Sequence, residues 1–208
     1  MCENDGHDMV ETSLDLAATH LRHGRIVAFP TETYYGLAVD PDCASAVAQL
    51  FAVKKRPADK PLLLLIERTE QLGAVVQNVP PVYWPLIKKY WPGPLTLIFP
   101  ARKSLSRRIT GNTGTVGIRI SPHPIAQGLV RRMGKPITAT SANISGFPPA
   151  QSAQDVIEMF GNKIDYIVDG GQTPAGLCST ILSVQNGRLN LVRHGQIDFS
   201  EELGGGTV

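Results

Sequence analysis

Short apolar segments alternate with stretches of helical periodicity along most of this chain. The apolar spacing predicts helices at residues 11–23, 43–55, 69–77, 82–90, 124–133 and 152–160. The β-rich runs between them predict strands at 25–29, 61–66, 94–100, 115–120, 136–140, 165–168, 179–184 and 188–192. This alternation is typical of an α/β fold with helices flanking a sheet. Because strands dominate the C-terminal part, we expect a mixed sheet rather than a purely parallel one.

The length of 208 residues favours a single domain, because domains typically contain about 100–200 residues. We expect it to span residues 1–208, with its core from about residue 14 to 195 between an acidic N-terminal segment and a C-terminal tail. No apolar run approaches the roughly 20 residues that a membrane helix needs. The N-terminus also lacks the basic and apolar segments of a signal peptide. We therefore expect a cytoplasmic protein without membrane association.

Acidic residues are absent from residues 71–154, although the formal net charge is only +2. The same segment contains ten basic residues: Lys88, Lys89, Arg102, Lys103, Arg107, Arg108, Arg119, Arg131, Arg132 and Lys135. This asymmetry predicts a positive field on part of the surface, suited to a phosphate-rich partner such as a nucleotide or RNA. The alternative is that these are solvated charges that only keep the protein soluble.

Motifs of covalent or metal-dependent catalysis are missing from the sequence. It contains no GxSxG, HExxH or Walker A motif. The five histidines show no metal-ligand spacing. The three cysteines, Cys2, Cys43 and Cys178, lie far apart, which predicts reduced thiols without a disulfide framework or structural zinc. Covalent catalysis and a metal held by the protein are therefore disfavoured.

Four polar segments adjoin predicted strands, where α/β proteins usually bind their ligands. They are residues 29–37, 54–61 and 138–146, and, as a fourth, residues 179–180 together with 193–195 after the last strand. Each segment alone also fits an ordinary turn or a solvated helix end. Their hydroxyl, amide and charged side chains are Thr31, Glu32, Thr33, Lys54, Arg56, Lys60, Ser141, Asn143, Ser179 and Arg193.

Together these segments resemble the YrdC/TsaC family of threonylcarbamoyl-AMP synthases. The resemblance covers about residues 14–195, nearly the whole chain. Its motifs are PTET-Y-GL (30–37), KxRP with a following KPL (54–62), WPGPLT (91–96), VGIR (116–119), HPIA (123–126), TSANISG (140–146), DGG (169–171), STI (179–181) and RHG (193–195). One such motif is weak, but nine in this order are highly specific.

The resemblance implies a twisted, mixed α/β sheet bent around a large, positively charged cavity. It implies that L-threonine, bicarbonate and ATP give threonylcarbamoyl-AMP and pyrophosphate, with Mg²⁺ accompanying the nucleotide. In this family, a separate transferase complex then moves the threonylcarbamoyl group to adenosine 37 of tRNAs that read ANN codons. Direct binding of tRNA or other RNA is a further expectation.

The resemblance also implies roles for individual side chains. Thr33, Arg119 and Ser179 are expected to hold L-threonine, with Arg119 pairing bidentately with its carboxylate. Lys54 and Arg56 are expected to be catalytic, by neutralising charge on the phosphates during transfer. The expected ATP site comprises Lys54, Arg56, Lys60, Thr115, Ser141, Asn143 and Arg193.

The chain departs from the family pattern in three places. The strand after KxRP is Leu62-Leu63-Leu64-Leu65, where some members carry a polar residue or histidine that helps to bind threonine. Lys60 stands where some relatives have asparagine. Longer relatives add a C-terminal domain with a lid-forming linker, so this sequence resembles the short form.

Two other functions fit parts of the sequence. The acid-free segment fits a non-catalytic RNA-binding module, although aromatic residues make up only 6% and form no recognisable RNA-binding motif. A carbamoyl-adenylate-forming module, as in hydrogenase-maturation proteins, is the other alternative. Those proteins carry additional acylphosphatase, zinc-finger and transferase domains that this sequence lacks.

Overall fold

A computed structural model describes residues 4–199, so Cys2, Glu201 and Glu202 lie outside the described residues. The helices are α1 (Asn4–Arg22), α2 (Ala44–Lys54), α3 (Leu72–Val75), α4 (Tyr83–Tyr90), α5 (Arg107–Thr110), α6 (Pro124–Met133) and α7 (Ala153–Phe160). The strands are β1 (Val27–Phe29), β2 (Gly36–Ala38), β3 (Leu63–Leu65), β4 (Leu95–Pro100), β5 (Thr115–Arg119), β6 (Ile137–Ser141), β7 (Tyr166–Ile167), β8 (Thr180–Gln185) and β9 (Arg188–Arg193). Two 3₁₀ turns, Thr69–Gln71 and Gly161–Lys163, precede α3 and follow α7.

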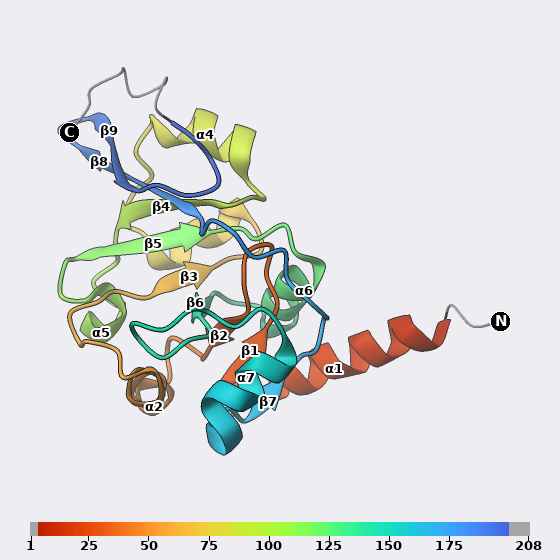
Figure 1. Cartoon of the computed structure of the whole chain (residues 1–208). Helices are drawn as coiled ribbons and strands as arrows, with labels where there is room; N and C mark the ends of the chain where they lie inside the picture. The colour runs from red at the N-terminus through yellow and green to blue at the C-terminus, as the bar shows by residue number, and fades with distance from the viewer. Residues whose placement is uncertain (1–3, 200–208) are drawn as a thin grey trace.

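The nine strands of residues 4–199 form one sheet in the order β7-β1-β2-β6-β3-β5-β4-β8-β9 (Figure 1). The pairs β1–β7, β3–β5 and β4–β8 are parallel, and the other neighbouring pairs are antiparallel. The prediction of a mixed α/β sheet with flanking helices is therefore confirmed.

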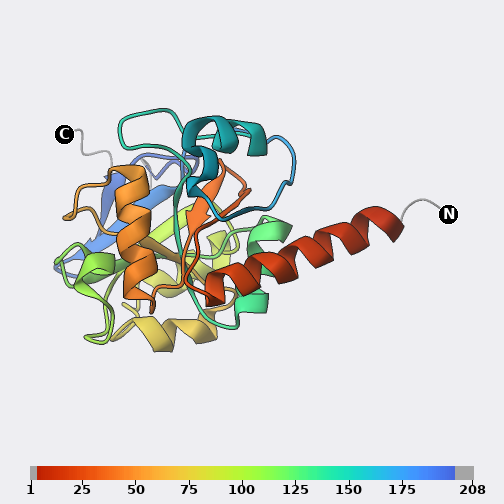
Figure 2. The ribbon, with the colours of Figure 1, turned by 90° about the horizontal axis from the view of Figure 1, so that it is seen from below.

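Alternating side chains on the strands divide the core between the two faces of the sheet. On β1, Val27 and Phe29 pack in one cluster with α1 and α6, while Ala28 belongs to the other cluster with α2, α4 and α7. Leu64 and Leu65 of β3 divide in the same way, as the two-residue period of a strand requires. Both views show α1 against α6, with the N-terminal half of α1 extending away from the rest (Figures 1 and 2).

Some elements differ from the sequence-based expectations. The strand β2 was not predicted, because three residues beginning with a glycine carry no alternating pattern; pairing with β1 and β6 makes it a strand. The short α5 was also not predicted. The helix expected at 69–77 is a 3₁₀ turn followed by the four residues of α3, and the helix expected from residue 11 begins at Asn4.

Gly111 ties the end of α5 to the loop that carries Arg56 and Lys60. Its φ is +57°, in the left-handed region that favours glycine. A Cβ at this position would lie 2.4 Å from the Asp59 carbonyl oxygen and 2.9 Å from the Pro61 nitrogen. Both are backbone atoms, so the loop would have to move to accept a side chain.

We expect Gly111→Ala to lower the melting temperature more than Gly114→Ala does. Gly114 has a φ of +70°, but a Cβ there would meet nothing within 4 Å, so its substitution costs only the backbone strain of about 1–2 kcal/mol. In a chain of this size, such a strain lowers the melting temperature by a few degrees, because each kcal/mol shifts it by roughly 2–4 °C. Thermal unfolding of the two variants side by side tests this. Equal melting temperatures would contradict this expectation, because they would show that the backbone of residues 59–61 moves to accept a side chain at little cost.

Candidate functional site

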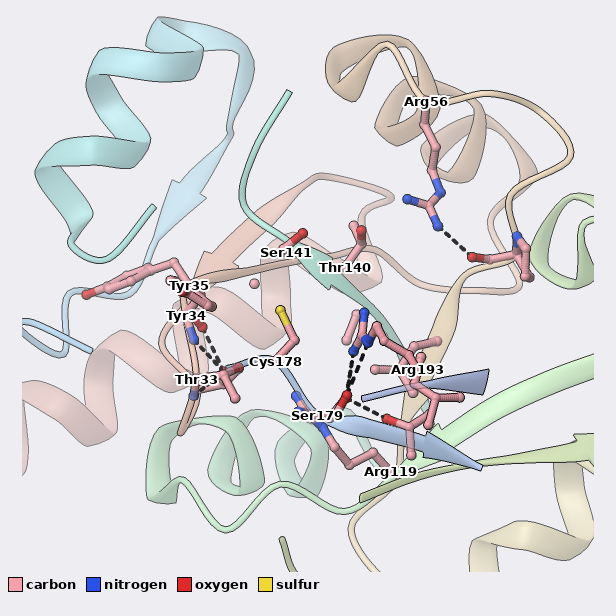
Figure 3. Close-up of a pocket in the computed structure, with 17 residues that line it drawn as sticks. Thr33, Tyr34, Tyr35, Arg56, Arg119, Thr140, Ser141, Cys178, Ser179 and Arg193 are labelled. Atoms are coloured by element: carbon pink, nitrogen blue, oxygen red, sulfur yellow. Dashed lines mark hydrogen bonds between the residues drawn. The ribbon is translucent and has the colours of Figure 1, made fainter. Parts of the chain in front are cut away.

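A cavity of about 230 Å³ lies over one face of the sheet, where residues of strands β6, β3, β5, β4 and β8 line it together with the surrounding loops (Figure 3). Its walls come from the β1–β2 loop, the segment after α2, and the ends of β5, β6 and β9. Six of the side chains expected to bind ligand line it: Thr33, Arg56, Arg119, Ser141, Ser179 and Arg193. The structure thus brings together residues that are up to 160 positions apart, and three of the six are arginines.

Arg119 lies at the end of β5 and is almost completely buried, with a side-chain exposure of 6%. Its Nη1 lies 2.8 Å from Oε1 of Glu32, which comes from the β1–β2 loop. Burial lowers the pKa of Arg119, the Glu32 carboxylate raises it, and the charge of Arg193 lowers it. In the described chain, Nε of Arg119 is buried without a hydrogen-bond partner. The guanidinium therefore retains donor capacity at the cavity wall.

Arg193 and Ser179 form a second polar cluster on the same cavity. Arg193 donates from Nε and Nη2 to the Ser179 carbonyl oxygen at 3.1 and 2.8 Å, and from Nη2 to Ser179 Oγ at 3.0 Å. Ser179 Oγ also lies 2.9 Å from Thr96 Oγ1 on β4. These contacts hold the β9 arginine against the segment that leads into β8.

Thr31 and Thr33 shape the β1–β2 loop at the cavity. Their hydroxyl oxygens lie 3.0 Å apart, and Thr31 Oγ1 donates to the Tyr34 carbonyl oxygen at 2.7 Å. The Thr33 and Tyr34 backbone N–H groups donate back to Thr31 Oγ1. Such local side-chain to backbone bonds are the usual reason why short hydroxyl residues stabilise tight turns. Both hydroxyls consequently lie in the cavity wall.

Lys54 lies at the end of α2, is only 1% exposed, and is not among the residues that line the cavity within the described chain. Its Nζ donates to the Ser141 carbonyl oxygen, to the Asn143 carbonyl oxygen at 2.6 Å, and to Asn143 Oδ1 at 3.3 Å. Burial, with a smaller effect of the Arg56 charge, lowers the pKa of Lys54 to about 7. Lys54 therefore fixes the loop that presents Ser141 to the cavity.

The Asn143 side chain is part of the same loop support. Its Oδ1 accepts from Ser141 Oγ at 2.5 Å, and its Nδ2 donates to the carbonyl oxygens of Ile144 and Phe147. Asn143, Lys60 and Thr115 are, like Lys54, absent from the cavity lining of the described residues. The ligand roles expected for these four residues stay predictions.

Arg56 reaches the cavity from the segment after α2. Its Nη2 donates to the Pro61 carbonyl oxygen at 2.6 Å and its Nε to the Lys60 carbonyl oxygen at 3.3 Å. The guanidinium carbons of Arg56 and Arg108 each lie 5.9 Å from the centre of the Phe51 ring. These contacts orient Arg56, which lines the cavity.

Several lining residues were not singled out from the sequence. Tyr34, Tyr35, Thr96, Thr140 and Cys178 all line the cavity, and Figure 3 shows the Cys178 sulfur directed into it. Tyr34 and Tyr35 lie in the PTET-Y-GL motif and Thr140 in the TSANISG motif. Their place in these motifs could have indicated that they line the site. Thr96 ends the WPGPLT motif and Cys178 directly precedes the STI motif, but neither motif indicated that these two side chains line the cavity.

The described residues contain no group of three or more His, Cys, Asp or Glu side chains placed to hold a metal ion. Glu32, the carboxylate next to the cavity wall, is engaged by Arg119 and by Ser121 Oγ at 2.5 Å. A divalent cation at this site would therefore be held mainly by a ligand's own oxygen atoms, as Mg²⁺ often is by phosphates. No helix among residues 4–199 is long and apolar enough to span a membrane.

Comparison with known proteins agrees with this geometry. Residues 19–195 match the family model Sua5_yciO_yrdC, which is described as "Telomere recombination". The chain belongs to the Sua5/YciO/YrdC family. The resemblance noted in its motifs is thereby confirmed.

Two relatives and one solved structure show how closely the chain follows this family. It is 42% identical over 191 residues to the threonylcarbamoyl-AMP synthase of Pyrococcus abyssi, covering 92% of this chain and 56% of the relative. It is 35% identical over 160 residues to that of Photobacterium profundum, covering 76% of this chain and 86% of the relative. The crystal structure of P. abyssi Sua5 complexed with L-threonine matches with a TM-score of 0.88 at 42% identity, over 92% of this chain and 56% of that one.

The chain therefore spans about half the length of the Pyrococcus relative. Its nine-stranded fold corresponds to the matched half of that protein.

We expect Lys54→Met to destabilise the protein by several kcal/mol, while Lys60→Met leaves its stability unchanged. Methionine has a similar length but donates no hydrogen bond, so the Ser141 and Asn143 carbonyl oxygens lose their buried partner at about 1–3 kcal/mol each. Lys60 is exposed. Denaturant unfolding at pH 7 measures both variants. Equal stability of the Lys54→Met variant and the wild type would contradict the loop-fixing role.

Proposed function

We propose that this chain synthesises threonylcarbamoyl-AMP and pyrophosphate from L-threonine, bicarbonate and ATP. The observation that supports this most strongly is the buried Arg119 guanidinium, which lines a cavity with donor capacity to spare. Such a group fits the carboxylate of an amino acid, because arginine pairs bidentately with carboxylates. The relatives named threonylcarbamoyl-AMP synthase and the relative complexed with L-threonine support the same reaction.

In this proposal, the threonine side of the cavity consists of Arg119, Thr33 and Ser179. Arg119 binds the carboxylate, and the two hydroxyls bind the remaining polar groups of the amino acid. Leu63 also lines the cavity, so the leucine-rich strand gives this side an apolar surface in place of a polar contact. An apolar surface suits the methyl group of threonine.

The nucleotide side consists of Arg56, Arg193 and Ser141. The guanidinium groups of Arg56 and Arg193 bind phosphate oxygens, for which their planar forks are suited. Lys60 and Thr115 extend this side, and Lys54 and Asn143 act by holding the Ser141 loop in place. Mg²⁺ enters with ATP and is bound mainly by the phosphates.

The reaction requires positioning and charge neutralisation rather than a protein nucleophile. The threonine amine adds to CO₂ derived from bicarbonate, and the resulting N-carboxylate attacks the α-phosphorus while pyrophosphate leaves. Arg56 and Arg193 in the cavity wall stabilise the negative charge that accumulates on the phosphates during transfer. Lys54 contributes indirectly, since its N–H groups are used by the loop carbonyls.

The product serves tRNA modification in this proposal, and the chain acts in the cytoplasm. A separate transferase complex takes the threonylcarbamoyl group to adenosine 37 of tRNA. A non-catalytic RNA-binding module is the weaker alternative. It gives no reason for the buried Arg119 and the buried Thr33 and Ser179 hydroxyls gathered around one cavity, which a small polar ligand explains.

Pyrophosphate release tests the proposal directly. The purified chain is incubated with ATP and Mg²⁺, and L-threonine and bicarbonate are omitted in turn. We expect release only when both are present, and mass spectrometry should detect threonylcarbamoyl-AMP. Release with neither substrate would indicate a plain pyrophosphohydrolase. No release by folded protein that binds RNA would favour the binding module.

We expect Arg119→Gln and Arg56→Gln to separate the two halves of the site. Arg119→Gln should weaken L-threonine binding about tenfold or more and ATP binding only slightly, because a buried charged partner is lost on one side only. Arg56→Gln should have the reverse effect. Isothermal titration of each ligand measures both. An equal loss of both ligands in either variant would contradict the division of the cavity.

A further inference from the structure

Glu32 carries a carboxylate that the proposed reaction does not use. It lies in the β1–β2 loop between Thr31 and Thr33, whose side chains line the cavity. Glu32 is not among the lining residues of the described chain, and its side chain is 13% exposed. It therefore lies behind the wall that its two neighbours form.

Each oxygen of this carboxylate contacts one side chain from the end of β5 or the residues just after it. Arg119 Nη1 lies 2.8 Å from Oε1, and Ser121 Oγ donates to Oε2 at 2.5 Å. Ser121 Oγ in turn accepts from the His123 backbone N–H at 3.2 Å, just before α6. The contacts join the β1–β2 loop to the segment between β5 and α6.

The ion pair uses one nitrogen of the guanidinium. Glu32 Oε1 lies at ion-pair distance from Arg119 Nη1, but the N–H···O angle does not allow a hydrogen bond. Arg119 Nε also has no hydrogen-bond partner within the described residues. A guanidinium offers five N–H donors in a planar fork. Glu32 therefore contacts only Nη1 of a guanidinium that lines the cavity, and the other nitrogens are not engaged by it.

Glu32 also balances two like charges. Arg119 and Arg193 line the same cavity, and the pKa of Arg119 is lowered chiefly by burial and further by the positive charge of Arg193. Arg193 is held by Ser179, whereas Arg119 has the Glu32 carboxylate as its charged partner. A buried charge without its partner is strongly unfavourable.

We propose that Glu32 is a positioning residue that orients the Arg119 guanidinium for the carboxylate of the amino-acid substrate. This inference rests on the proposed function for the identity of the ligand. Glu32 touches neither the substrate nor the reacting atoms, and it acts through Arg119 alone.

The substitution Glu32→Gln keeps the size of the side chain and removes its charge. Arg119 then faces Arg193 without compensation, so the guanidinium turns away from its cavity position. This loss outweighs the gain in positive potential, because bidentate pairing depends on geometry. Threonine binding is therefore expected to weaken, although the cavity becomes more positive.

The test compares L-threonine and ATP binding by isothermal titration in wild type and Glu32→Gln. We expect L-threonine to bind about tenfold more weakly and ATP within about twofold of wild type. In turnover, KM for threonine should rise by the same factor while kcat at saturation stays nearly constant. The control Glu67→Gln removes an ion pair with Arg131 at 3.0 Å on the surface and should change neither ligand.

Two further variants separate positioning from folding. Ser121→Ala removes one contact to the carboxylate but keeps its charge, so it should weaken threonine binding about threefold without unfolding the chain. In the double variant Glu32→Gln/Arg119→Gln, threonine should bind no more weakly than in Arg119→Gln alone, because Glu32 acts only through Arg119.

Threonine binding that is unchanged or tighter in Glu32→Gln would overturn the inference. An equal weakening of ATP and threonine, or additive losses in the double variant, would also overturn it, since either result indicates a general structural role. Failure of the wild-type protein to bind L-threonine would instead refute the proposed function, and the wild-type titration identifies that case separately.

Discussion

The burial of the Arg119 guanidinium at the end of β5 is the constraint on which the site depends. A charge at 6% side-chain exposure requires a partner, and Glu32 supplies it from a loop that is distant in sequence. The ion pair links the β1–β2 loop to β5, and so brings the Thr31 and Thr33 hydroxyls to the same cavity. In the proposed function, donors that the ion pair leaves unused bind the carboxylate of the amino acid.

A second buried cation supports the opposite side of the cavity. The Lys54 amine connects the end of α2 to the backbone carbonyl oxygens of the loop after β6. Asn143 adds its own bonds within that loop and accepts from Ser141. The KxRP and TSANISG motifs therefore supply two kinds of residue, those that line the cavity and those that support the lining residues. Arg56 and Ser141 line the cavity, whereas Lys54 and Asn143 hold the segment around Ser141 in place.

The mixed sheet explains why these groups meet. Strand β3 pairs parallel with β5 and antiparallel with β6, and β4 pairs parallel with β8. Five neighbouring strands, β6, β3, β5, β4 and β8, each place a residue in the cavity lining, so the cavity lies over one face of the sheet and the loops close its rim. Membership of the Sua5/YciO/YrdC family fits an architecture in which the loops, rather than one motif, form the site.

The sequence alone determined the alternation of helices and strands, the mixed sheet and the nine motifs of the family. These features depend on local periodicity and on short runs such as KxRP and TSANISG, which are readable without coordinates. Tertiary structure decided that Lys54 points inward, that Glu32 faces Arg119, and that Cys178 and Thr96 line the cavity. Local patterns cannot fix these points, because burial and partner choice depend on strand pairing between segments far apart in the chain.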